Sequence, residues 1–334
     1  MNLATRVLQS LETWDGGPAV IEPGATGAYR EVAASELRDR IEALAAQLRG
    51  WGLGPGRRAA LFLENSSDFI VAFLAVLRTG AVVAPVKLEY RWWELTQILS
   101  NLQPHFVIAE EGHLSVLEPQ LGDAGLVVRT GYAAFTVRGQ ADSGGQPVAG
   151  GSPDSERHAV AGDIASINYT YRGYGYPVGA LIPHEAYLHG ARVFAAGMEG
   201  RMCRRMLVVL PMAHIFTLIG CVWTPLLYGM TTVLANTVNP KRLFAMVEHY
   251  RIDFLTMVPE LLRFLSRVIP RNADLSSLDI VASGGSVLSA EEFDRVRERF
   301  GAELLHGYGL TEFTPVSCNR RGAARPGTVG TVGA

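Results

Sequence analysis

The chain has 334 residues, of which 48% are hydrophobic and 19% are charged, and its formal net charge is -2. This length is enough for about two globular domains, each with its own core. A nearly balanced charge lacks the basic surface that nucleic-acid binding requires, so no nucleic-acid partner is expected.

The first half of the chain alternates between helical and strand patterns. Four leucine or isoleucine residues at helical spacing predict an amphipathic helix over 35–52. The elements expected after it are a strand at 57–64, a helix at 66–80 capped by Asn65 or Ser66 and closed by Gly80, a strand at 81–86, a helix at 92–102 and a strand at 105–111.

A break in this pattern follows at 139–158, which is rich in Gly, Ser, Pro and charged residues. Such a composition predicts a surface loop or linker. We therefore expect two domains: residues 1–160 form a first α/β subdomain, and residues 161–334 form a second one that carries the glycine-rich loops.

Strands and helices alternate again after the linker. This alternation predicts an α/β fold with mainly parallel sheets, joined by right-handed crossovers. The expected strands are 165–171, 206–210, 231–235, 254–258, 278–285 and 302–309, and the expected helices are 184–198, 240–250, 259–268, 289–300 and one between 210 and 231.

One long run without charged residues mimics a membrane span. From Met206 to Pro240 there is no Asp, Glu, Lys or Arg, and the run exceeds the roughly 20 residues that a span needs. Pro211, Pro225 and Gly229 divide it into short pieces, which indicates buried strands around a buried helix. We expect no transmembrane segment, and membrane association through this run is the alternative.

The cysteines and the N-terminus bear on the compartment. Cys203, Cys221 and Cys318 are widely spaced and form no CxxC pair, so neither a zinc site nor a disulfide framework is expected. The N-terminal residues have no long apolar run, and Glu12 and Asp15 come early, which argues against a signal peptide. Both features predict a cytoplasmic protein.

Three loops follow predicted strands: 168–179 (NYTYRGYGYPVG), 283–289 (SGGSVLS) and 306–312 (HGYGLTE). In parallel sheets, ligands bind beyond the carboxyl ends of the strands. The first loop has two interpretations. It is either a phosphate cradle built from backbone N–H groups or a turn decorated with tyrosine rings.

The loop HGYGLTE combines groups that suit a nucleotide. Gly307 and Gly309 permit close backbone approach or positive φ. Tyr308 offers a flat ring to a base, Thr311 offers a hydroxyl to a phosphate, and Glu312 offers a carboxylate oxygen that suits Mg²⁺. The alternative is a glycine turn with an exposed glutamate.

The loop SGGSVLS leads from a strand into a helix. Ser289 is a suitable N-cap, with Glu291 and Glu292 in the first turn. The cap does not account for Gly284 and Gly285, which suggest a flat ligand lying against the backbone.

A histidine follows the uncharged strand 206–210. The segment PMAHIF (211–216) places His214 in apolar surroundings. We expect His214 to line an apolar pocket. A catalytic role is the second interpretation.

The order of these motifs resembles the adenylate-forming superfamily, which includes acyl-CoA synthetases, luciferases and the adenylation domains of peptide synthetases. The order is glycine loop, PMAHIF, a VPE segment at 258–260, SGG and GYGLTE. The likeness covers residues 25–334 and includes AFLAVLRTGAVVAPV at 72–86. It implies two stacked α/β/α subdomains with mainly parallel sheets.

The resemblance implies a two-step reaction. A carboxylate attacks the α-phosphate of ATP to form acyl-AMP and pyrophosphate, and a thiol of coenzyme A or of a carrier protein then takes the acyl group. The implied cofactors are ATP or AMP, Mg²⁺ and coenzyme A, and the implied partner is a small carboxylic acid. The apolar segments expected to line the pocket favour a fatty or aromatic acid.

The resemblance also implies roles for individual residues. Tyr308 would lie against adenine, Thr311 would contact phosphate, Glu312 would hold Mg²⁺, and His214 would shape the acyl pocket with Val258 and Pro259. Taken together, the implied catalytic residues are Thr311, Glu312 and His214, and the implied cofactor-binding residues are Thr170, Arg172, Gly173, Gly175, Gly179, Gly284, Gly285, Ser286, Gly307, Tyr308 and Gly309.

The first loop departs from the pattern of the family, which reads roughly Y-[ST]-S-G-[ST]-T-G-x-P-K-G. Tyr171 and Tyr174 stand where the family has small residues, and Val178 stands where it has lysine. Arg172 is the candidate replacement for that charge, because guanidinium binds phosphate well. The loop therefore has either an altered phosphate contact through Arg172 or none.

The family normally continues beyond RPGTVGTVGA into a β-rich subdomain and a C-terminal domain with a catalytic lysine. The resemblance implies that these parts are absent and that the chain is a fragment with poor activity alone. The alternative is a catalytically inactive protein of the same fold that binds an acyl group or a nucleotide.

Overall fold

The computed structural model describes residues 2–24, 27–138, 163–171, 175–198, 204–235 and 237–332. The chain divides into two compact units. The first comprises Met1–Glu12 and Ser35–Tyr187, and the second comprises Thr13–Ala34 and Leu188–Ala334. Each unit contains one large, mainly parallel sheet.

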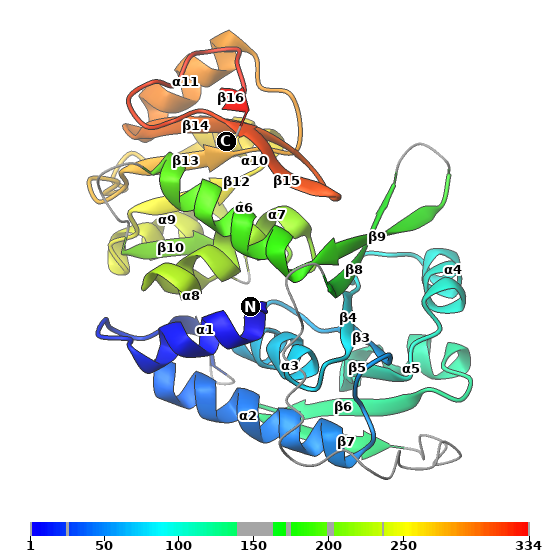
Figure 1. Ribbon diagram of the computed structural model, residues 1–334. Helices are drawn as coiled ribbons and strands as arrows, with labels where there is room; N and C mark the ends of the chain where they lie inside the picture. Colours follow the sequence, from blue (N-terminus) through cyan, green and yellow to red (C-terminus); the bar gives the residue numbers. More distant parts are fainter. Residues whose placement is uncertain are drawn as a thin grey trace. The chain divides into compact units, whose positions relative to one another are not determined.

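The first unit is built on a seven-stranded sheet in the order β7-β6-β5-β3-β4-β8-β9 (Figure 1). Its pairs are parallel except for the hairpins β6–β7 and β8–β9 at the two edges. The elements are α1 (Leu3–Glu12), α2 (Ala34–Gly50), β3 (Arg58–Phe62), α3 (Ser67–Arg78), β4 (Val82–Pro85), α4 (Trp92–Leu102), β5 (Phe106–Glu110), η1 (Glu111–His113), α5 (Leu114–Leu117), η2 (Glu118–Gln120), β6 (Gly125–Gly131), β7 (Ala134–Arg138), β8 (Ile164–Tyr171) and β9 (Pro177–Pro183).

The second unit is built on a nine-stranded sheet in the order β16-β15-β14-β13-β12-β10-β11-β1-β2. The central strands are parallel, and antiparallel pairs lie at both ends. The elements are β1 (Val20–Pro23), β2 (Tyr29–Val32), α6 (His184–Gly197), β10 (Arg205–Val208), α7 (Ile215–Thr217), the π-helical η3 (Leu218–Trp223), α8 (Thr224–Tyr228), β11 (Thr231–Leu234), α9 (Pro240–His249), β12 (Phe254–Met257), α10 (Pro259–Val268), β13 (Ile280–Ser283), α11 (Ala290–Phe300), β14 (Glu303–Leu310), β15 (Phe313–Cys318) and β16 (Thr331–Val332).

The predicted α/β class with mainly parallel sheets is confirmed. The strands β8 and β9, at 164–183, lie in the first sheet, although the sequence analysis grouped these residues with the second subdomain. Strands β1 and β2 likewise lie in the sheet of the second unit. The predicted boundary at residue 160 falls within 139–162, outside the described residues, and stays a prediction.

The uncharged run that mimics a membrane span folds within the second unit. Residues 206–235 form most of β10, the short helices α7, η3 and α8, and β11. In the part of the chain that the structure describes, no helix has both the length and the apolar character needed to cross a bilayer.

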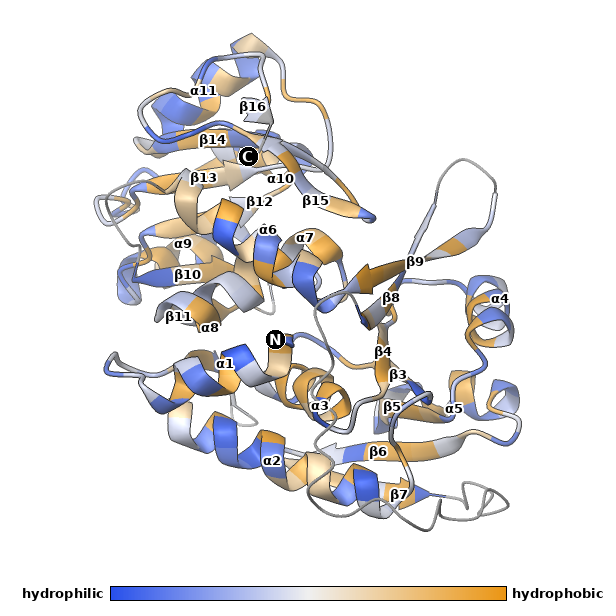
Figure 2. Ribbon diagram, in the orientation of Figure 1, coloured by the Kyte–Doolittle hydropathy of each residue, from blue (hydrophilic) through white to orange (hydrophobic). Residues whose placement is uncertain are grey.

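Helix α3 is buried along almost its whole length, because its residues are apolar on all sides (Figure 2). Its one buried charge is Asp68, which is fully buried in the first turn. Arg40 of α2 and Arg129 of β6 both pair with its carboxylate, and the N–H of Ala133 donates to it at 3.2 Å. These contacts connect the buried helix to two other elements.

We predict that Asp68→Ala lowers the free energy of unfolding by about 3–5 kcal/mol, because it removes the buried anion that two partly buried guanidinium groups share and leaves them only their outer partners, Glu36 and Glu110. The matched control is Asp39→Ala on the exposed pair Arg38–Asp39, where the expected loss is below about 1 kcal/mol. Urea denaturation measures both. Equal effects of the two substitutions would contradict the prediction.

A second buried polar contact joins the two ends of the first unit. His184 is 2% exposed, and its Nδ1 accepts a hydrogen bond from the N–H of Leu3 at 3.2 Å. Burial lowers the pKa of His184 to about 4, whereas an unfolded histidine titrates near about 6.5. Between these values the unfolded chain binds more protons than the folded chain.

The stability that this histidine contributes is therefore present above about pH 6.5 and is lost as the pH falls towards about 4. We expect the melting temperature to fall less steeply between pH 7 and pH 5 in His184→Asn than in the wild type. The control His249→Asn, on an exposed residue, should keep the wild-type slope. If the melting temperature changed with pH equally in all three proteins, the role assigned to His184 would be refuted.

Candidate active-site loops

Four segments of the second unit leave its sheet at the same level. Strands β10, β12, β13 and β14 are parallel neighbours, and their register pairs Val208 with Thr256, Met257 with Ser283, and Ser283 with His306. The segments that follow therefore begin in one row at the carboxyl edge of the sheet: 209–216, 258–260, 284–289 and 307–312.

Gly284 is the point at which three of these segments approach one another. A Cβ atom at this position would lie 3.3 Å from the carbonyl oxygen of Gly307 and 3.5 Å from the ring of Phe216. Gly285 has a φ of 93°, which other residues rarely adopt, and its Cβ position lies 3.7 Å from Val258. The structure thus brings together the predicted residues of the segments 211–216, 258–260, 284–286 and 307–309.

The predicted loop GYGLTE is the end of a β-hairpin. Strand β14 continues to Leu310 and pairs with β15 from Phe313 onwards, so Thr311 and Glu312 form the two-residue turn. Tyr308 is 47% exposed, and Glu312 is also exposed at the turn. Both side chains are therefore accessible to a ligand.

A polar network that the sequence analysis missed surrounds Ser286. Its hydroxyl donates to Glu260 Oε1 at 2.7 Å, and Arg263 pairs with Glu260 at 3.4 Å and with Glu292 at 2.6 Å. The hydrogen bond from Ser286 lowers the pKa of Glu260. Arg263 and the N–H of Ser289 lower the pKa of Glu292 to about 2. The i,i+3 spacing of Glu260 and Arg263 near the start of α10 was the available signal.

The two histidines of this edge have different surroundings. His214 caps α7, where its Nδ1 accepts a hydrogen bond from the N–H of Phe216 at 3.3 Å, so it supports the local backbone. His306, which the sequence analysis did not single out, is 3% exposed, and its Nδ1 has no hydrogen-bond partner within the described ranges. Burial lowers the pKa of His306, so the ring is neutral at neutral pH.

The loop at 168–179 belongs to the first unit, in the hairpin of β8 and β9. Thr170 lies opposite Val178, and Tyr169 lies opposite Gly179. A Cβ at Gly179 would lie 2.8 Å from Cγ2 of Ile167 and 3.4 Å from the Tyr169 ring, so close packing against these two side chains of β8 accounts for the glycine. Gly175 has a φ of 79°. The predicted phosphate contacts Arg172 and Gly173, with Tyr174, lie outside the described residues.

Comparison with known proteins identifies the family. The model of the family described as AMP-binding enzyme matches residues 9–334. The chain belongs to the AMP-binding enzyme family. This membership confirms the resemblance to the adenylate-forming superfamily that the order of the motifs indicated.

Curated relatives are similar over most of this chain. The chain is 27% identical to the acyl-CoA synthetase FUM10 of Gibberella moniliformis (strain M3125 / FGSC 7600), across 96% of this chain and 61% of that protein. It is 26% identical to the 4-coumarate–CoA ligase CCL1 of Humulus lupulus, across 92% of this chain and 57% of that protein. The chain therefore spans less than two thirds of the length of these relatives.

Solved structures show the same fold for this member of the AMP-binding family. A benzoate CoA ligase from Burkholderia xenovorans LB400 matches with a TM-score of 0.81 and 24% identity, over 99% of this chain and 66% of that one. The luciferase-like enzyme of Zophobas morio matches with a TM-score of 0.84 and 19% identity, over 99% and 79%. At these identities the likeness concerns the fold alone.

A group of three possible metal ligands lies in the first unit of this family member. The ligand atoms of Glu64, Glu110 and His113 all lie within 4.8 Å of one another. Glu110 also pairs with Arg129 at 3.2 Å, and a guanidinium so close disfavours a further cation. Glu312, the predicted magnesium ligand, belongs to no such group of three among the residues that the structure covers.

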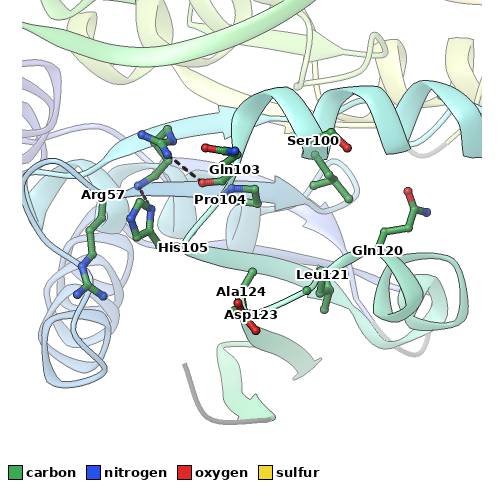
Figure 3. A pocket seen from close by; sticks show the side chains of 12 residues that line it. Arg57, Ser100, Gln103, Pro104, His105, Gln120, Leu121, Asp123 and Ala124 are labelled. Atoms are coloured by element: carbon green, nitrogen blue, oxygen red, sulfur yellow. Dashed lines mark hydrogen bonds between the residues drawn. The ribbon is translucent and has the colours of Figure 1, made fainter. Parts of the chain in front are cut away.

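A cavity of about 540 Å³ lies at the amino edge of the seven-stranded sheet (Figure 3). Arg58 donates to the carbonyl oxygens of Leu102 at 2.6 Å and Gln103 at 3.1 Å, and His105 Nδ1 accepts from the N–H of Arg58 at 3.2 Å. These hydrogen bonds stabilise the wall of the cavity. Since α/β folds bind ligands at the other edge, we assign no ligand to it.

Gly307 provides a test of the close approach between the loops. A Cβ there would lie 3.0 Å from the carbonyl oxygen of Ser317 and 3.2 Å from Cys318 Cβ. We predict that Gly307→Ala lowers the free energy of unfolding by about 1–3 kcal/mol, because β14 and β15 must separate to admit the methyl group. Gly17→Ala is the control, since nothing lies within 4 Å of its Cβ position. Unchanged urea midpoints for both variants would contradict the prediction.

Proposed function

We propose that the protein is an AMP-forming acid–thiol ligase of the acyl-CoA synthetase type. The single observation that carries this proposal is the match of the AMP-binding enzyme family to residues 9–334. The row of four segments at the carboxyl edge of the second sheet supports it, because α/β folds bind nucleotides at such an edge. A cytoplasmic location is part of the proposal and rests on the cysteine pattern.

The proposed reaction has two steps. A carboxylate oxygen attacks the α-phosphorus of ATP, the bond from that phosphorus to the bridging oxygen breaks, and pyrophosphate leaves. A thiol of coenzyme A or of a carrier protein then attacks the carbonyl carbon of the acyl-AMP, and AMP leaves as the thioester forms. Such steps depend on positioning and on neutralising the phosphate charge.

Residues of the second unit supply the positioning in this proposal. The exposed ring of Tyr308 stacks on adenine, and the backbone at Gly284 and Gly285 lies flat against the ligand. The hydroxyl of Thr311 donates to a phosphate oxygen. The carboxylate of Glu312 suits Mg²⁺, which takes one or two protein carboxylates together with phosphate oxygens and neutralises their charge.

We propose a fatty or aromatic acid as the substrate. The rings of Phe194 and Phe216 lie 5.9 Å apart, and Phe216 and Val258 both approach the glycines at 284–285. Apolar groups at this point favour an apolar acyl chain or ring over a charged acid. Relatives named for aromatic acids support this class, among them a feruloyl-CoA synthase of an Amycolatopsis species at 27% identity.

A second candidate function is binding of a nucleotide or an acyl-AMP without activation of the acid. The observation that favours it is Val178, which places an apolar, 37% exposed side chain opposite Thr170, where the family pattern has a lysine. A valine cannot donate the hydrogen bond that a lysine would give to a phosphate, and loss of a hydrogen bond to a charged group costs about 1.5–3 kcal/mol of binding free energy.

The deciding experiment measures binding and turnover on the same preparation. Calorimetry with Mg·ATP and with an acyl-sulfamoyl adenosine is followed by acid-dependent ATP–pyrophosphate exchange over a panel of fatty and aromatic acids. We expect binding of both compounds, exchange with at least one acid, and a loss of exchange in Glu312→Gln of about tenfold or more.

Glu291→Gln is the matched control, because its carboxylate is 84% exposed on α11 and should leave exchange unchanged. Binding without exchange would favour the second candidate. If the protein bound neither Mg·ATP nor the acyl-sulfamoyl adenosine, both candidates would be contradicted.

A further inference from the structure

The loop 284–289 of the second unit has an exposed middle between two buried ends. Gly284 and Leu288 are buried, whereas the three residues between them are exposed, and Val287 is 79% exposed. The first of these three is Gly285, whose backbone is free to adopt many conformations. An exposed segment of this kind has little packing to hold it. Its conformation must therefore be fixed by groups outside the loop.

The first such group is a carboxylate at the start of α10. Glu260 Oε1 accepts a hydrogen bond from the hydroxyl of Ser286 at 2.7 Å. This contact ties the middle of the loop to the neighbouring segment 258–260. The Ser286 hydroxyl is thereby directed towards the protein.

Arg263, further along α10, makes the second set of contacts. Its Nη2 donates to the carbonyl oxygen of Val287 at 2.7 Å. The same guanidinium binds both carboxylate oxygens of Glu292, from Nε at 2.6 Å and from Nη2 at 3.1 Å. Its Nη1 lies 3.4 Å from Glu260 Oε1. The planar fork of arginine suits this bidentate geometry, so one side chain joins the loop to both carboxylates.

Glu292 fixes the end of the loop where α11 begins. Its Oε2 accepts from the N–H of Ser289 at 3.0 Å, and the Ser289 hydroxyl accepts from the N–H of Glu292 at 3.2 Å. This reciprocal pair is a capping box. Because Arg263 binds the same carboxylate, the position of Val287 is linked to the first turn of the helix.

We call Glu260, Arg263 and Glu292 the loop clamp. Their side chains are 63%, 30% and 28% exposed, and ion pairs of such exposure add little to the stability of a fold. The effect of the clamp falls on the conformation of the loop. A ligand that needs one conformation binds more weakly in proportion to the fraction of molecules that have it.

We propose that Arg263 is a positioning residue that holds the loop 284–289 in the conformation which binds the nucleotide part of a ligand. The inference rests on the proposed function and concerns residues of the second unit alone. Arg263 acts through the backbone of Val287 and through Glu292, and it does not itself touch the ligand. Sequence motifs do not mark it.

Binding kinetics test the proposal. Mg·ATP and an acyl-sulfamoyl adenosine are the probes, and surface plasmon resonance gives both rate constants. We expect Arg263→Met to weaken binding of each probe by about tenfold, with slower association and unchanged dissociation, because fewer molecules have the competent loop. Arg263→Lys should restore only part of the affinity, since an ammonium group cannot form the bidentate fork.

The exposed pair Arg295–Glu291 on α11 supplies matched controls, with side chains 46% and 84% exposed. Arg295→Met and Glu291→Gln should bind both probes like the wild type. Glu292→Gln is the second test variant. It keeps the size of the side chain but weakens the fork, so we expect binding about threefold weaker or more. Thermal melts establish that each variant is folded, and Glu292→Gln decides the proposal if Arg263→Met does not fold.

Hydrogen exchange reports on the loop without any ligand. Peptide mass spectrometry of the unliganded protein should show faster deuterium uptake at 284–289 in Arg263→Met than in the wild type. Uptake by the same peptide should not change in Arg295→Met. This readout separates a change in the loop from a lost contact with the ligand.

Each outcome decides the proposal. Slower association together with faster exchange at 284–289 supports it. Unchanged affinity in Arg263→Met overturns the role of Arg263 and leaves the proposed function intact. Faster dissociation with unchanged association and exchange also overturns it, because Arg263 would then contact the ligand. If the wild type binds neither probe, the proposed function fails and the role of Arg263 falls with it.

Discussion

The candidate active-site loops depend on the parallel register of β10, β12, β13 and β14. Because Met257, Ser283 and His306 lie in one row, the three segments that follow them leave the sheet at a common level. No interaction among the loops is needed to bring them there. Close packing then depends on the absence of a side chain at Gly284, since a Cβ there would lie 3.3 Å from the carbonyl oxygen of Gly307. The backbone arrangement thus comes first, and the chemical groups at Tyr308, Thr311 and Glu312 are added to it.

Carboxylates hold backbone segments in place at the carboxyl edge of each sheet. At the carboxyl edge of the second sheet, Glu260, Arg263 and Glu292 form a partly exposed network around Ser286, which holds the start of α11 beside the glycine pair. At the carboxyl edge of the first sheet, Glu94 accepts hydrogen bonds from the Tyr171 hydroxyl and from the N–H of Arg91. In both units, a carboxylate with fixed hydrogen-bond partners therefore positions a segment of backbone at the edge of the sheet.

Much of the fold and part of the site could be predicted from local patterns. The alternation of apolar runs and capped helices identified the strands that end at 257, 283 and 310, since these signals are contained within each element. The pairing of β8 with β4 was missed, because the partner of Ser166 is Val83, across the long segment at 139–158. Glu260 and His306 were also missed, because their significance arises from burial and neighbours that only the folded chain creates.

The carboxylate of Asp68 has a consequence for the order of assembly. Its two cationic partners come from α2 and β6, which lie on opposite sides of α3 in the chain. Burying a carboxylate before a cation reaches it costs several kcal/mol. Packing of α3 onto β3 and β4 alone is therefore unfavourable. Burial of the helix becomes favourable when the distant strand β6 docks and brings Arg129 to the carboxylate. The first unit should accordingly nucleate through contacts that are far apart in sequence, which makes its folding slow relative to a unit built from local hairpins.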